Sequence, residues 1–235
     1  MTDMATAFGV FANSGNKVGL NPIIEVRDSS GRVLEKKSPL SQSVIDPKIA
    51  FIISDILSDN TARTPTFGSR SQLYIPGSVV AVKTGTTNNL RDNWTIGYTP
   101  DFLVAVWVGN NDNSPMSYVA SGVTGASPIW RRTTDLLLKK FPSPGFSPPE
   151  DILKAAVCPV TGELACPACP GKTEYFLPGT QPKAVCSEAS IRPTPIPAST
   201  PPASVSAPVE NQKNKPDKDK WDLRGKILDG AWTVR

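Results

Sequence analysis

The sequence predicts an α+β fold, in which an antiparallel β-sheet is flanked by helices. Two observations predict it: short β-branched and aromatic runs joined by tight turns, and amphipathic segments with helix-start signals before and after those runs. We expect this unit to occupy residues 1–142, followed by a linker over 143–156 and a small cysteine-stapled segment over 157–190. Residues 191–220 are rich in Pro, Ala, Ser and Lys and are expected to form a disordered tether, while 221–235 form a short terminal segment.

A helix and a hairpin are expected first. Thr2 or Asp3 is a suitable cap for a short helix that runs through Phe11. Residues 21–37 alternate between apolar and polar side chains, turn at 28–31 and alternate again, which is typical of a β-hairpin.

A second helix is predicted to start at Asp46, an N-cap residue, with Pro47 at its first position. One face of this helix is apolar, and we expect that face to be buried; it carries Ile49, Ile52, Ile53, Ile56 and Leu57. The segment from Thr61 to Gly77 is rich in Thr, Pro, Gly and Ser, and it therefore predicts a loop.

Three strands and a helix complete the unit. Val79, Val80 and Val82 indicate the first strand, and residues 92–100 and 101–112 indicate two more that are joined by a tight turn. Strands this apolar belong centrally in a covered sheet, so we expect the first of them to lie inside the sheet. A helix capped by Ser127, with Pro128 at its first position, should face inward through Ile129, Trp130, Thr133, Leu136 and Leu137. Trp94 and Trp107 are likewise interpreted as core aromatics.

The composition excludes several classes of function. The chain has no histidine, so any nucleophile here would need a lysine, a carboxylate or a hydroxyl as its base. The net charge is only +4 and the basic residues are scattered, so we expect no nucleic-acid partner. No run of eighteen apolar residues and no signal-peptide pattern is present. Because "ATAFGVFANSG" reads as the middle of a folded element, we expect the chain to be a piece whose upstream half is missing.

The tetrapeptide Lys83-Thr84-Gly85-Thr86 follows the first of these strands. A lysine ammonium offers three hydrogen-bond donors and each threonine offers a hydroxyl, a combination that suits a carboxylate. Gly85 has no Cβ, so a ligand or another backbone can approach the strand closely. The alternative interpretation is a solvated lysine at a strand end, followed by a turn glycine.

Five blocks carry a family resemblance: "MATAFGVFANSG", "FIISDILSDN", "AVKTGTT", "RDNWTIGYTPDFLVAVWVGN" and "SGVTGASPIW". In this order, they resemble the second half of the transpeptidase domain of class A penicillin-binding proteins, whose fold is shared with serine β-lactamases. The resemblance implies a peptidoglycan cross-linking D,D-transpeptidase that forms a serine acyl-enzyme with stem peptides or β-lactams and needs no cofactor or metal. It also implies cell-wall synthesis machinery as partner and a position at the extracytoplasmic face of the membrane, with an anchor and a glycosyltransferase domain upstream.

The resemblance also implies a role for each residue of the tetrapeptide. Lys83 would supply positive potential near the reacting serine and the substrate carboxylate, and Thr84 and Thr86 would bind that carboxylate. The backbone N–H of Thr86 would be one oxyanion-hole donor. Gly85 would keep the strand edge bare so that substrate can lie against it.

Two further patterns imitate the remaining motifs of the family, Ser-x-x-Lys and Ser-x-Asn. The first recurs at Ser14 and Lys17 and the second at Ser58 and Asn60, and we reject both. A catalytic Ser-x-x-Lys needs a helical turn that puts both side chains on one face, whereas Ser14 lies among turn-forming Asn and Gly residues. Ser58 lies at the end of a helix that Asn60 is expected to terminate. We therefore expect the nucleophile to be absent from this chain.

Two alternative functions stay open at this point: a non-catalytic module that binds wall peptide or a partner, and a β-lactamase-like serine hydrolase. Arg91 and Asp92, beside the tetrapeptide, could contact substrate, but an ion pair within the hairpin is favoured.

The four cysteines are Cys158, Cys166, Cys169 and Cys186. An even number in a Pro- and Gly-rich segment without a core predicts two disulfides in an oxidising compartment. The C-x₂-C spacing of Cys166 and Cys169 also permits a Cys₄ zinc site, which ranks second, and free thiols rank third. The sequence does not separate the three possible pairings.

Overall fold

A computed structural model describes residues 1–38, 40–116 and 124–191. Its elements are, in order, α1 (Thr2–Ala12), β1 (Asn16–Val18), β2 (Glu25–Arg27), β3 (Val33–Lys36), β4 (Ser41–Ser43), α2 (Pro47–Ser58), α3 (Asn60–Phe67), β5 (Ala81–Thr86), a 3₁₀ turn (Asn88–Leu90), β6 (Asp92–Tyr98), β7 (Leu103–Gly109), α4 (Ala126–Lys140), β8 (Leu153–Val157), β9 (Lys172–Phe176) and α5 (Glu188–Ile191). The tether and terminal segment expected beyond residue 191 lie outside the described residues. No described helix is long and apolar enough to cross a membrane.

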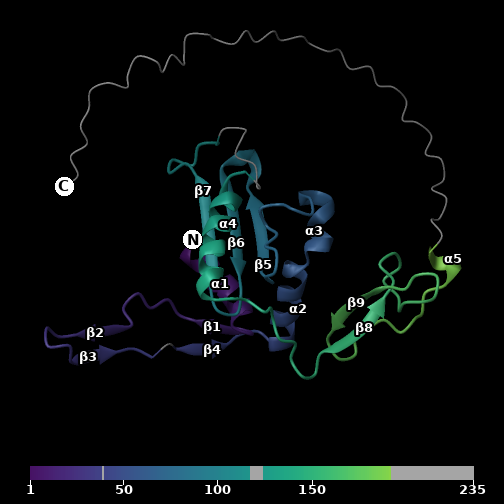
Figure 1. Ribbon diagram of the computed structural model, residues 1–235, viewed down its shortest axis with the longest axis horizontal. Helices are drawn as coiled ribbons and strands as arrows, with labels where there is room; N and C mark the ends of the chain where they lie inside the picture. Colours follow the sequence, from purple (N-terminus) through teal and green to yellow (C-terminus); the bar gives the residue numbers. More distant parts are fainter. Residues whose placement is uncertain (39, 117–123, 192–235) are drawn as a thin grey trace, which may run out of the picture. The chain divides into compact units, whose positions relative to one another are not determined.

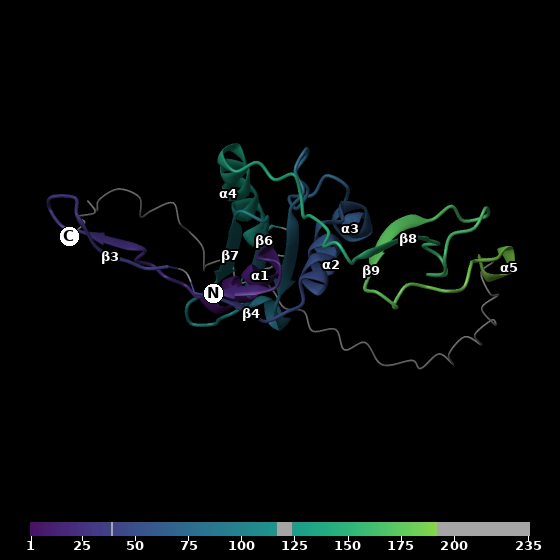
Figure 2. The same cartoon turned by 90° about the horizontal axis from the view of Figure 1, so that it is seen from below.

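The central sheet is antiparallel, with the strand order β5-β6-β7. Helix α4 packs on one face of this sheet, and α1 and α2 pack on the other (Figures 1 and 2). The predicted α+β fold is therefore confirmed. The predicted hairpin is also present as β2 and β3, and its turn is held by Asp28, which accepts hydrogen bonds from the backbone N–H groups of Ser30 and Arg32 at 2.9 Å each.

The core lies between the sheet and α4, around the fully buried ring of Trp130. Val80, Val82 and Val104 supply the strand side of this cluster. Gly97 faces the indole ring so closely that a Cβ at this position would collide with it. A glycine in the middle strand thus makes room for the largest buried side chain.

The helix starts agree only in part with the prediction. Asp46 caps α2 as expected, because its carboxylate accepts the backbone N–H of Lys48 at 2.7 Å. In contrast, α1 begins at Thr2 without a side-chain cap, and α4 begins at Ala126 rather than after Ser127. The Ser127 hydroxyl is instead buried and lies 2.9 Å from the hydroxyl of Thr95.

The predicted buried face of α2 is wrong in part. Ala50, Phe51 and Ser54 are buried, and the predicted Ile52, Ile53 and Leu57 are half-buried, whereas the side chains of Ile49 and Ile56 are 42% and 58% exposed. The physical reason is close approach: small residues let α2 pack against the sheet, mainly at β5, and the Ser54 hydroxyl lies 3.1 Å from that of Tyr98 on β6. The same correction applies to α4, which buries Trp130 and Thr134 and leaves Ile129, Thr133 and Leu136 exposed.

Part of the loop predicted over 61–77 is helical. Asp59 ends α2 and caps α3, accepting the backbone N–H groups of Thr61 at 2.8 Å and Ala62 at 3.1 Å. Asn60 therefore opens α3 instead of terminating α2, which corrects its predicted role. Asp59 could have predicted this helix, because Asp is a favoured N-cap residue.

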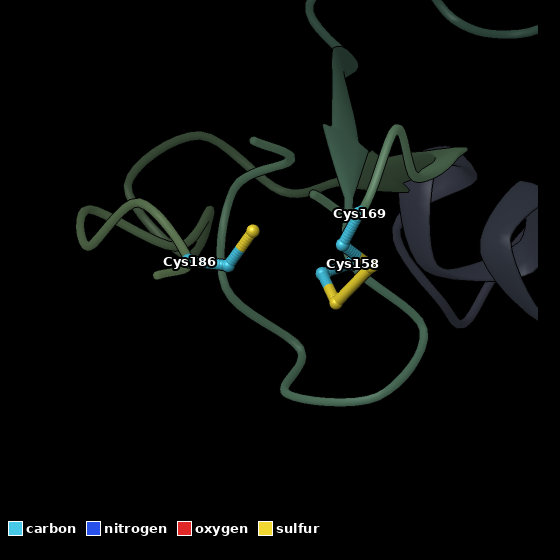
Figure 3. A group of neighbouring side chains, drawn as sticks. All are labelled: Cys158, Cys169 and Cys186. Atoms are coloured by element: carbon cyan, nitrogen blue, oxygen red, sulfur yellow. A yellow bond between two sulfur atoms is a disulfide. The ribbon is translucent and has the colours of Figure 1, made fainter. Parts of the chain in front are cut away.

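The C-terminal module, defined here as residues 148–190, contains the hairpin of β8 and β9. Its cysteines form two disulfides, Cys158–Cys169 and Cys166–Cys186. Figure 3 shows Cys158, Cys169 and Cys186 close together, and their sulfur atoms lie within 4.8 Å of one another. With all four sulfur atoms bonded in pairs, thiolates for a metal would exist only after reduction.

Candidate functional site

The tetrapeptide lies on β5, an outer strand of the central sheet. Only β6 pairs with β5 in the part of the chain that the structure describes, so its other edge has no strand partner there. The expectation that this strand lies inside the sheet is therefore wrong. An outer strand leaves backbone N–H and C=O groups available, and an extended peptide can pair with such an edge.

Lys83 and Gly85 share the face of the sheet that α1 and α2 cover, since Ala81 on that face is opposite Tyr98, which contacts α2. The Lys83 side chain is exposed, and its Nζ donates to the carbonyl of Thr84 at 2.6 Å. No described carboxylate pairs with this ammonium. A Cβ added at Gly85 would meet only the Cβ of Trp94, at 3.9 Å, so the backbone is open to a neighbour here.

Thr84 and Thr86 point to the opposite face, where Thr86 is held by a buried asparagine. Asn93, the partner of Thr86 across the strands, donates from Nδ2 to the Thr86 hydroxyl at 3.1 Å. Its Oδ1 accepts the backbone N–H of Ala126 at the start of α4, at 2.6 Å. Because Thr86 Oγ1 already accepts a hydrogen bond, its own proton is free to donate outward. The pair therefore presents the Thr86 hydroxyl as a donor.

Asn93 is a residue that sequence reasoning missed. It is fully buried near the start of β6, and its partner Ala126 is 33 positions away. An amide side chain in a strand that was expected to be covered on both faces was the available signal.

The predicted Arg91–Asp92 ion pair does not form. Arg91 donates to the carbonyl of Asn113 at 2.6 Å, and Asp92 accepts the indole N–H of Trp107 at 2.8 Å and the hydroxyl of Thr87 at 3.1 Å. Asp92 thus fixes the turn that follows β5. Trp107 and Trp94 are half-buried and adjacent, with ring centroids 6.5 Å apart, so of the three predicted core tryptophans only Trp130 is fully buried.

A hollow of about 230 Å³ lies between the tetrapeptide and the junction of α2 and α3. Lys83 and Thr84 line it from the strand, and Leu57, Asp59 and Arg63 line it from the helices. The guanidinium of Arg63 donates to the carbonyls of Leu57 and Asp59, and burial lowers its pKa from the ordinary value. Lys83 and Thr84 therefore face a partly apolar hollow that also contains charged groups.

Neither imitation motif has nucleophile geometry. Ser14 follows α1 with a left-handed backbone (φ 51°), and Lys17 belongs to β1, so the two do not share a helical turn. The Ser58 hydroxyl donates to the carbonyl of Asp55 at 2.9 Å, and the Asn60 amide donates to the carbonyl of Ser69 at 3.1 Å. Both polar groups are engaged with backbone.

The family models match in two places. Residues 1–130 match the penicillin-binding protein transpeptidase domain, and residues 148–190 match the C-terminal domain of penicillin-binding protein 1A. The chain belongs to the penicillin-binding protein transpeptidase family. Its predicted resemblance to class A penicillin-binding proteins is confirmed.

Relatives and solved structures agree. Penicillin-binding protein 1A of Clostridium tetani (strain Massachusetts / E88) is 33% identical over 194 residues, covering 78% of this chain and 24% of that protein. Penicillin-binding protein 2D of Bacillus subtilis (strain 168) is 31% identical over 190 residues, covering 78% and 27%. The crystal structure of penicillin-binding protein 1A from Haemophilus influenzae superposes with a TM-score of 0.69 at 25% identity, covering 78% of this chain and 32% of that chain. The chain spans about a quarter of the length of these curated relatives.

Proposed function

We propose that this chain supplies one wall of the active site of a serine D,D-transpeptidase that cross-links peptidoglycan and is acylated by β-lactams. One observation carries the proposal: on the open outer strand β5, an exposed Lys83 stands beside a bare Gly85 and a Thr86 hydroxyl oriented as a donor. A carboxylate fits donors of this kind, and both stem peptides and penicillins carry one.

In the complete protein, a serine from a segment other than Ser14 or Ser58 attacks the carbonyl of a D-Ala-D-Ala-type peptide. The serine proton passes to a lysine base, the terminal D-Ala leaves as its amine, and the resulting ester is then attacked by the amine of a second stem peptide. The hydroxyls of Thr84 and Thr86 hold the substrate carboxylate, and Lys83, on the other face of the same outer strand, contributes positive potential. The Thr86 N–H stabilises the negative oxygen of the tetrahedral intermediate.

The cellular location and the partners are proposed from the same family membership. We infer that the complete protein works at the extracytoplasmic face of the membrane, with an anchor and a glycosyltransferase domain elsewhere in its sequence and with the cell-wall synthesis machinery as partner. An oxidising compartment suits the two disulfides of the C-terminal module.

Lys83→Ala in the complete protein tests this proposal. Removing a charge-assisted interaction worth roughly 1.5–3 kcal/mol should slow acylation by labelled penicillin about ten- to a hundredfold. The melting temperature should change little, because Lys83 is exposed and alanine fits a strand. Lys17→Ala is the matched control, since it removes the lysine of the imitation motif. Acylation of the Lys83 variant at the wild-type rate would contradict the proposal and favour the alternative interpretation, in which Lys83 is a solvated lysine at a strand end.

A further inference from the structure

Lys172, at the start of β9, lies among acidic side chains of two different parts of the fold. Its Nζ is 2.5 Å from Oδ2 of Asp59, between α2 and α3, and 2.9 Å from Oε1 of Glu174 on its own strand. Asp55 of α2 is also close enough for the charges of Lys172 and Glu174 to act on it. The ammonium of Lys172 thus interacts with several carboxylates where the C-terminal module contacts α2 and α3.

The ionisation of these groups reflects this arrangement. Burial and the charge of Glu174 raise the pKa of Asp55 from its ordinary value. Burial alone would also raise the pKa of Asp59, but hydrogen bonds from Lys172 and from the α3 backbone outweigh burial and bring it below the ordinary value. Hydrogen bonds to Asp59 and Glu174 raise the pKa of Lys172. Without Lys172, the carboxylates would repel one another.

Asp59 connects this cluster to a helix start. While Oδ2 receives Lys172, Oδ1 caps the first turn of α3 by accepting the N–H groups of Thr61 and Ala62. The same carboxylate therefore holds α3 and the C-terminal module together.

An aromatic contact lies beside the charged one. The ring of Phe51, buried on α2, meets the ring of Tyr175 on β9 edge to face, with centroids 4.9 Å apart. The ammonium of Lys154 on β8 lies 5.3 Å from the centroid of the Tyr175 ring. The module thus contacts α2 through packing and the junction of α2 and α3 through charge.

This junction forms the wall of the hollow opposite the tetrapeptide. Asp59 and Arg63 line the hollow from the helices, while Lys83 and Thr84 line it from β5. A group that fixes Asp59 therefore fixes the wall that faces Lys83.

We propose that Lys172 is a positioning residue: through Asp59, it makes the C-terminal module a brace for the junction of α2 and α3 and so holds the wall opposite Lys83 and Thr84. The bracing needs no substrate. Only its effect on acylation rests on the proposed function.

Hydrogen exchange of the 235-residue chain tests the brace. Lys172→Met should speed exchange of the α3 amides, around Thr61 and Ala62, roughly two- to fivefold, the upper part of the range expected for a partly exposed charged pair. Lys172→Arg should restore most of the protection because it keeps the charge. Lys183→Met, an exposed lysine of the same module without an ion pair among the described residues, is the matched control and should leave α3 unchanged.

Asp59→Asn separates the brace from the cap. Asparagine still caps α3 but carries no charge, so this variant should resemble Lys172→Met, and the double variant should be no worse than either single one. Additive effects would overturn the proposal, as would unchanged α3 exchange in Lys172→Met while β8 and β9 stay protected.

A second measurement addresses acylation by labelled penicillin in the complete protein. Lys172→Met should raise the penicillin concentration for half-maximal acylation rate about threefold or more and leave the saturated rate unchanged, because Lys83 itself stays in place. Faster α3 exchange without this rise would overturn the positioning role. If Lys83→Ala proved harmless, the proposed function would fall, and the exchange experiment would still decide the brace.

Discussion

In the α+β unit, Trp130 forms a buried cluster with five other apolar side chains, whereas the core of the C-terminal module is made largely of Cys158, Cys169 and Cys186. Both regions contain antiparallel strands, yet one is stabilised by packing across long sequence distances and the other by covalent links over 11 and 20 positions. Small segments that bury little apolar surface need such links. The two regions should therefore respond to different perturbations.

Reduction of the two disulfides should produce the largest difference between the two regions. Each disulfide contributes about 2–4 kcal/mol, so a thiol reductant should remove the hydrogen-exchange protection of β8 and β9. The strands β5 to β7 contain no cysteine and should keep theirs. A reduced module that stays as protected as the oxidised one would show that packing, and not the disulfides, holds it.

The opposite perturbation is Asn93→Ala, which acts on the α+β unit and leaves the disulfides of the C-terminal module intact. It leaves the Ala126 N–H without its acceptor and should lower the free energy of unfolding of the α+β unit by about 1–3 kcal/mol. Thr86→Val is the control, because it removes the hydroxyl that accepts from Asn93 and leaves the acceptor of Ala126 in place. Urea unfolding measures both variants, and equal losses would mean that the Ala126 contact is not the stabilising one.

The smallest effect concerns alkaline pH. Burial raises the pKa of Tyr98 to about 12. A raised pKa means that the stability it contributes is complete below the ordinary value near 10 and is lost as the pH rises toward 12. Between pH 8 and pH 11, the wild type should lose about 1 kcal/mol more than Tyr98→Phe in urea unfolding. Equal losses would contradict the burial of this hydroxyl.

Local signals in the sequence predicted much of the sheet unit. The Asp46 cap, the hairpin of β2 and β3 and the three strands β5 to β7 each depend on neighbours in the chain, and each is present. The buried faces of α2 and α4 were predicted only in part, because these helices carry more apolar residues than the sheet can cover. Periodicity alone does not choose among them, and the small residues Ala50 and Ser54 decide the contact.

Part of the candidate site could be predicted in the same way. Lys83 to Thr86 stand out by residue type, but the orientation of the Thr86 hydroxyl depends on Asn93 and Ala126, which only the fold brings together. The contact of Lys172 with Asp59, 113 positions apart, is likewise long-range, and the cysteine pairing was one of three that the sequence allowed.

We expect β5 to bind the substrate carboxylate. A crystal structure of the complete protein acylated by a penicillin tests it most directly. The account predicts the antibiotic carboxylate within about 2.5–3.2 Å of the hydroxyls of Thr84 and Thr86, with the ester carbonyl accepting the Thr86 N–H. A carboxylate bound elsewhere, with both threonine hydroxyls still facing solvent, would contradict it.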